Sequence, residues 1–119
     1  MNEDIKVRWT ARLRSGQDEQ TKSVLRNLDD GKCCLGVLCE IAVEDGVIEA
    51  PYWAEHRDGY AYGSGDEADA VATLPRSVWE WAGLPDANPD APRTGVTLAA
   101  LNDKGFTFAQ LADLIDCDF

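Results

Sequence analysis

The sequence predicts a compact α+β domain with about four helices packed on one or two short β-hairpins. Three observations lead to this prediction. Apolar residues recur at helical spacing in several stretches. Turn signals rich in glycine and aspartate separate shorter apolar runs. The length of 119 residues suits one hydrophobic core, so we expect residues 1–119 to form a single domain.

The N-terminal stretch is predicted to begin with an amphipathic helix. Its apolar face is made of residues at successive spacings of four: Ile5, Trp9 and Leu13. Gly16 is expected to lie just past its end. The stretch 21–34 then carries the turn signal Asp29-Asp30-Gly31, which is typical of a hairpin that joins two short strands.

Residues 33–44 are predicted to form the central helix. Its buried face is expected to consist of residues spaced by three or four: Cys34, Val37, Leu38, Ile41 and Ala42. Gly36 inside this helix costs about 1 kcal/mol relative to alanine. We therefore expect another backbone to approach Gly36 closely. Asp45-Gly46 supplies the stop signal.

The stretch 51–72 mixes aromatic residues, glycines and acids, and this composition favours a loop-rich hairpin. Its expected strands are 60–62 and 70–73. A short helix should follow, with Pro75 at its first position and Gly83 just past its end. The proline-rich residues 86–93 are expected to form an extended loop.

The C-terminal region predicts two consecutive short helices. Thr97 can cap the first, over 98–101. For the second, Thr107 and Gln110 have the spacing of a capping box. Its expected buried face is Phe108, Leu111, Ala112, Leu114 and Ile115.

The formal charge of −11 is unevenly distributed. Through Lys32 the chain is nearly neutral, whereas from Cys33 onward four basic residues face sixteen acidic ones. Such a surface repels nucleic acid phosphates, so we do not expect direct nucleic-acid binding. Two interpretations stay open: a well-solvated acidic surface, or a surface that attracts a basic partner.

No apolar run approaches the roughly 20 residues that cross a bilayer, and no export signal opens the sequence. We therefore expect a cytoplasmic protein with no membrane contact. In that compartment the four cysteines are expected to be reduced thiols.

The cysteines suggest two possible kinds of site, a zinc site and a catalytic thiol. Zinc sites usually take paired ligands two to four residues apart, and this pattern is not met by Cys33, Cys34, Cys39 and Cys117. We therefore expect no metal and no cofactor. A thiol nucleophile at the start of the central helix, Cys33 or Cys34, is the second hypothesis. Its competitor is a buried core segment, and the only histidine, His56, lies far away in the sequence.

The candidate binding residues are a group of aromatics and the acids that follow them: Tyr52, Trp53, Tyr60, Tyr62, Asp66, Glu67 and Asp69. Aromatics on a hairpin with acidic neighbours are typical of an interface core with a charged rim. Packing of the aromatics in a satellite core, with the acids in a solvated turn, is the alternative interpretation.

Three motifs together resemble a known group of sequences. They are Cys-Cys-Leu-Gly-Val-Leu-Cys-Glu at 33–40, Leu74-Pro75 followed by Trp81-Ala82-Gly83-Leu84, and Leu101-Asn102-Asp103 with the helix after it. In this order they resemble small uncharacterised proteins of tailed phages and prophages. Cys33 stands where an aromatic residue is expected. The resemblance implies a phage origin and a place in the bacterial host cell, and it brings no known activity.

The leading hypothesis is a non-enzymatic phage accessory protein that binds a host macromolecule, in host takeover or counter-defence. The expected partner is a host protein with a basic surface. Two alternatives stay open. One is a small-molecule binder or sponge with a pocket between the hairpin and the central helix. The other is an enzyme that uses Cys33 or Cys34.

Overall fold

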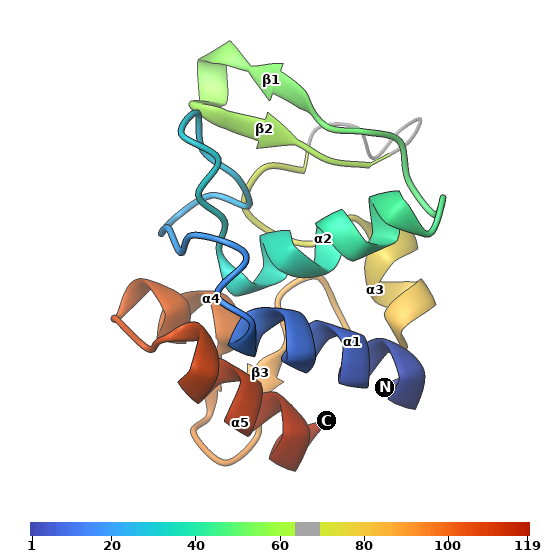
Figure 1. Ribbon diagram of the computed structural model, residues 1–119, viewed down its shortest axis with the longest axis vertical. Helices are drawn as coiled ribbons and strands as arrows, with labels where there is room; N and C mark the ends of the chain where they lie inside the picture. Colours follow the sequence, from blue (N-terminus) through green and yellow to red (C-terminus); the bar gives the residue numbers. More distant parts are fainter. Residues whose placement is uncertain (64–69) are drawn as a thin grey trace.

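The computed structural model describes residues 1–63 and 70–119, and it confirms the predicted α+β class. The helices of this part are α1 Glu3–Arg14, α2 Cys34–Glu44, α3 Arg76–Ala82, α4 Leu98–Asp103 and α5 Phe108–Asp118. Two antiparallel pairs of strands accompany them, β1 Tyr52–Ala54 with β2 Gly59–Ala61, and β3 Asp90–Ala91 with β4 Val96–Thr97. In Figure 1, α2 crosses the middle of the molecule, α1, α4 and α5 lie below it, and β1–β2 occupies one end of the long axis.

The predicted helix signals are present in the structure. The face of α1 with Ile5, Trp9 and Leu13 is buried, and α1 packs against α2 and α5. The indole Nε1 of Trp9 donates a hydrogen bond to the Cys34 carbonyl at 2.9 Å. At the other end of the chain, Thr107 caps α5 in the predicted capping box.

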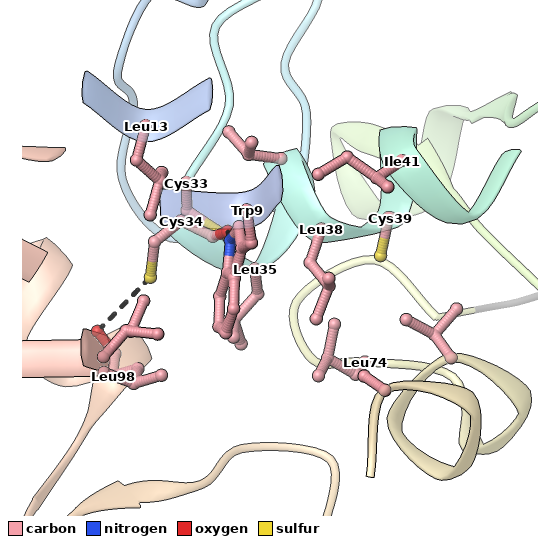
Figure 2. Close-up of a cluster of buried hydrophobic side chains, with 14 of the residues drawn as sticks. Trp9, Leu13, Cys33, Cys34, Leu35, Leu38, Cys39, Ile41, Leu74 and Leu98 are labelled. Atoms are coloured by element: carbon pink, nitrogen blue, oxygen red, sulfur yellow. Dashed lines mark hydrogen bonds between the residues drawn. The ribbon is translucent and has the colours of Figure 1, made fainter. Parts of the chain in front are cut away.

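Helix α2 is the centre of the apolar core. Every residue from Cys34 to Cys39 is buried, and Figure 2 shows its side chains between those of α1, Leu74 and Leu98. The expectation for Gly36 is confirmed, because a Cβ atom there would lie 1.8 Å from the carbonyl oxygen of Leu25. The helix therefore holds the preceding loop at backbone contact.

A buried amide connects this loop to the C-terminal helices. Asn102 of α4 is fully buried, and its Oδ1 accepts hydrogen bonds from the Cys34 amide at 3.2 Å and from Gln20 Nε2 at 2.9 Å. Its Nδ2 donates to the Thr21 carbonyl at 2.7 Å. One side chain thus satisfies polar groups of two separate segments, the loop at Gln20 and Thr21 and the start of α2.

The predicted hairpin over 21–34 was wrong. Its turn exists, because the Asn27 amide donates to the Gly31 carbonyl at 2.9 Å and Asp30 adopts a left-handed conformation with φ of 69°. However, Lys32 bridges to Gln20 on one side and to Arg26 on the other. Because each pairing stops after one residue, no ladder of strand hydrogen bonds forms.

The second hairpin exists with a different pairing. Trp53 lies opposite Tyr60, so β2 pairs with 52–54 and not with the predicted 70–73, from which only Ala70 forms a bridge, to Tyr62. The short 3₁₀ helix η1, Glu55–Arg57, and a left-handed Asp58 with φ of 54° close the turn locally. Such a short connection brings its own flanking residues together before distant ones.

Two smaller boundaries also differ. Pro75 is the residue before α3 rather than its first position, and it still fits there because it has no backbone N–H that would need a partner, while its carbonyl accepts from the Val78 and Trp79 amides. The expected loop 86–93 contains β3, whose pairing with β4 is closed by residues 92–95.

Candidate functional site

The aromatic candidates divide between the surface and the core. The side chain of Tyr52 is exposed, with 52% of its surface accessible, whereas Trp53 and Tyr60 are half-buried. The rings of Trp53 and Tyr60 meet edge to face, with centroids 5.3 Å apart. Tyr62 is fully buried and cannot belong to this surface. The acidic candidates Asp66, Glu67 and Asp69 lie outside the described residues.

The exposed side of the hairpin is hollowed. Its residues Tyr52–Arg57 line an open groove of about 500 Å³, which we call the hairpin groove. Four of its lining residues, Tyr52 and the three of Glu55–Arg57, are exposed, so this groove opens to solvent at the end of the molecule where Figure 1 shows β1–β2. An aromatic groove in such a position can accept an apolar side chain of another molecule.

The buried Tyr62 serves instead to connect the hairpin to α2. Its hydroxyl donates a hydrogen bond to the Glu40 carboxylate. Burial, and then this contact with Glu40, raise the pKa of the Tyr62 hydroxyl far above its ordinary value, so the phenol stays protonated. Tyr62 is therefore a hydrogen-bond donor that fixes Glu40 in place.

A second hollow, which sequence reasoning missed, lies beside the loop that precedes α2. This charged cleft has a volume of about 450 Å³. Its lining residues are Arg12, Gln17, Asp18, Glu19, Arg26, Asp29, Asp30, Lys32 and Glu40. One signal existed in the sequence: seven of the 11 basic residues of this acidic protein lie in its nearly neutral first 32 residues, where acids are interspersed among them.

Asp18 is the buried centre of the charged cleft. Its carboxylate accepts from Arg12 Nε at 2.9 Å and from Lys32 Nζ at 3.2 Å, and the side chains of Asp18 and Lys32 are only 4% and 7% exposed. Burial alone would raise the pKa of Asp18, but the hydrogen bonds and charges of Arg12 and Lys32 outweigh it and lower the pKa. The carboxylate therefore stays ionised and holds both cations at the cleft wall.

Arg26 connects the charged cleft to the hairpin. Its guanidinium pairs with Asp30 at 2.7 Å and with Glu40 at 3.5 Å. The same guanidinium lies 4.5 Å from the centre of the Tyr60 ring, which is a cation–π distance. Since Tyr60 in turn contacts Trp53, the side chains of Arg26, Tyr60 and Trp53 form one continuous stack from the cleft to the groove.

The cysteines lie apart from both hollows. Cys33, Cys34 and Cys39 are buried in the core, and the thiol of Cys34 donates to the Leu98 carbonyl at 3.8 Å (Figure 2). Burial raises the pKa of Cys33 to about 11 and raises those of Cys34 and Cys39 well above their ordinary value. Cys117 is exposed on α5. No group of three potential metal ligands occurs within residues 1–63 and 70–119.

In a comparison with known protein families, residues 1–119 match a family described as "Domain of unknown function (DUF8296)". The chain belongs to this DUF8296 family. No curated protein and no solved structure matches the chain. In the described part of this DUF8296 domain, no helix is long and apolar enough to cross a membrane.

Proposed function

We propose that this DUF8296 domain is a non-enzymatic accessory protein of a tailed phage or prophage that binds a basic surface of a bacterial host protein. The hairpin groove is the observation that supports this proposal most directly. It combines an exposed Tyr52 with a half-buried Trp53 at one end of the molecule. Tyr and Trp are enriched among the residues that dominate binding energies at protein interfaces.

The charge of the chain supports a basic partner. With a formal charge of −11, the domain attracts cationic surfaces and repels nucleic acids and other acidic molecules. Charge attraction of this kind mainly accelerates encounter and selects among partners. In the proposal it brings the partner to the domain, and the hairpin groove supplies the apolar contact.

The buried thiols give the cysteine-dependent alternative little support. A nucleophilic cysteine needs an accessible thiolate, whereas Cys33 and Cys34 are buried with raised pKa values. We expect iodoacetamide to modify only Cys117 in the native protein, with the other three thiols reacting after unfolding. Rapid modification of Cys33 or Cys34 in the folded state, detected by mass spectrometry, would revive that alternative.

The test of the proposal is capture of a bacterial host protein by the domain, compared between variants. Tyr52→Ala and Trp53→Ala remove the aromatic contact in the hairpin groove. Val7→Ala is the matched control, because Val7 is an equally exposed apolar residue, at 60%, on α1. Each protein is first checked for an unchanged circular dichroism spectrum.

The expected result is a host protein of basic surface that wild type and Val7→Ala retain and the two hairpin variants lose. Its direct affinity is then measured with purified components at low and moderate salt. Capture that is equal for all four proteins would contradict a role for the hairpin groove. Failure to capture any host protein at either salt concentration would contradict the proposal itself.

A further inference from the structure

The charged cleft has an excess of negative charge at its mouth. Each cation in its wall already has a carboxylate partner: Arg12 pairs with Asp18, Lys32 with Asp18 and Asp30, and Arg26 with Asp30 and Glu40. By contrast, Glu19 and Asp29 are exposed and form no ion pair with any described residue. Two negative charges at the cleft therefore remain uncompensated.

The walls of the charged cleft are fixed in position. Asp18 is held by two cations, and Glu40 is held by the Tyr62 hydroxyl and faces Arg26. A cleft whose polar groups are already positioned loses little conformational entropy when a ligand enters. Its polar lining also suits a ligand that forms several hydrogen bonds.

We propose that the charged cleft binds the guanidinium or ammonium group of an arginine or lysine side chain in the partner protein, while an apolar residue two positions away occupies the hairpin groove. This inference rests on the proposed function and names the chemistry that the partner presents. Glu19 and Asp29 supply the charge for the cation, and Tyr52 and Trp53 supply the contact for the apolar side chain.

The geometry between the two hollows favours a peptide segment. The stack from Arg26 through Tyr60 to Trp53 spans the region between them, with successive separations of 4.5 and 5.3 Å. In an extended segment, residues two positions apart point to the same face, with about 7 Å between them. A long cationic side chain and an aromatic one at that spacing reach both hollows.

An anion fits the charged cleft poorly. To reach Arg12 or Lys32 it would have to displace Asp18, whose side chain is 4% exposed. It would also have to approach Glu19 and Asp29. A free organic cation shares the proposed chemistry, but it gains nothing from the hairpin groove, and this difference separates the two sources of the cation.

The experiment is a titration of the ¹⁵N-labelled protein, followed by amide chemical shifts. The probe is the blocked tripeptide Arg-Gly-Phe, compared with Gln-Gly-Phe, Arg-Gly-Ala and free agmatine. We expect Arg-Gly-Phe to bind most tightly and to shift amides of both the 17–32 segment and β1–β2. Absence of shifts, or equal binding of Gln-Gly-Phe, would overturn the proposal. Agmatine binding as tight as that of the tripeptide would indicate a small-molecule site instead.

Two charge-matched variants locate the effect. Glu19→Gln combined with Asp29→Asn should weaken Arg-Gly-Phe binding about fivefold, since partly exposed ion pairs contribute about 0.5 kcal/mol each. Asp4→Asn combined with Asp90→Asn removes the same charge from exposed positions on α1 and β3, which Figure 1 places on the other side of the molecule from the hairpin. If both double variants weakened peptide binding equally, only the net charge of the protein would matter, and the proposal would be overturned.

The same variants separate this inference from the proposed function. Suppose that the Tyr52→Ala variant fails to capture a host protein that the Glu19→Gln and Asp29→Asn double variant captures in full. The proposed function then stands, and the proposed role of the charged cleft is contradicted. If the tripeptide binds as expected and no host protein is captured, the proposed function is contradicted while the cleft chemistry is not.

Discussion

The core around α2 and the hairpin β1–β2 are held in the protein by different forces. Residues Cys34–Cys39 are buried in the apolar core cluster. The hairpin packs Tyr60 and the adjoining Tyr62 against this core, but polar contacts also hold it, among them the Tyr60 amide to the Arg26 carbonyl at 3.0 Å and the Tyr62 hydroxyl to Glu40. Changes in the core should therefore affect global stability, whereas changes at the hairpin should act locally.

The largest effect is expected for Gly36→Ala. The new Cβ would lie 1.8 Å from the Leu25 carbonyl oxygen, so the loop must move away from α2. We expect the free energy of unfolding to fall by more than about 3 kcal/mol, measured by urea denaturation. Gly16→Ala is the control, because nothing lies within 4 Å of its Cβ and only its φ of 75° is unfavourable. Equal losses in both variants would refute close packing as the cause.

Asn102→Ala should have the next largest effect. It leaves the Cys34 amide and the Thr21 carbonyl without their side-chain partner and removes one of the two acceptors of Gln20 Nε2. We expect a loss of about 3 kcal/mol, because each buried unsatisfied group costs about 1 kcal/mol or more. The neighbouring Asp103→Ala, at an exposed position, should cost less than about 1 kcal/mol. A small effect of Asn102→Ala would show that water replaces these bonds.

The contribution of Asp18, in the charged cleft, to the free energy of unfolding should depend on pH. Its folded pKa is lowered relative to the unfolded chain, so its contribution to stability is present above about pH 4 and is lost as the pH falls through the folded pKa. At pH 7, Asp18→Asn should cost about 2 kcal/mol, because it deprives two cations of a carboxylate.

The pH dependence supplies the control for Asp18. Urea denaturation at pH 7, 5, 4 and 3 should show wild type and Asp18→Asn converging as the solution becomes acidic. A constant difference between the two proteins over this range would mean that the carboxylate charge contributes nothing.

The smallest effect is expected for Tyr62→Phe. It removes the hydrogen bond to Glu40, which is partly accessible to water, and should cost about 1 kcal/mol. Hydrogen exchange should accelerate in β1–β2 and remain unchanged in α2. Tyr60→Phe is the control, because it keeps the ring stacked on Arg26. Faster exchange throughout α2 would mean that the hairpin is part of the global folding unit.

The helices could be predicted because their signals are local. The spacing of Ile5, Trp9 and Leu13 and the capping box of Thr107 and Gln110 each lie within a few residues. The strand pairings could not be predicted in the same way. The partner of Tyr60 depends on the conformation of η1 and Asp58, which the composition of the stretch does not specify.

The candidate sites show the same limit. The aromatic hairpin was visible in the sequence, but the burial of Tyr62 depends on a partner, Glu40, that is 22 residues away. The charged cleft combines residues from α1, the following loop and α2. Only the fold brings Arg12, Asp18 and Lys32 together, because their side chains follow no common periodicity.

The contact at Gly36 has a consequence for the whole DUF8296 family. It presses the backbone at Leu25 against α2, and the loop that contains Leu25 forms most of the wall of the charged cleft. A family member with a larger residue at this position would have to displace that loop and reshape the cleft. The presence of glycine here is therefore a criterion for deciding which relatives share the cleft and the partner chemistry that we propose for it.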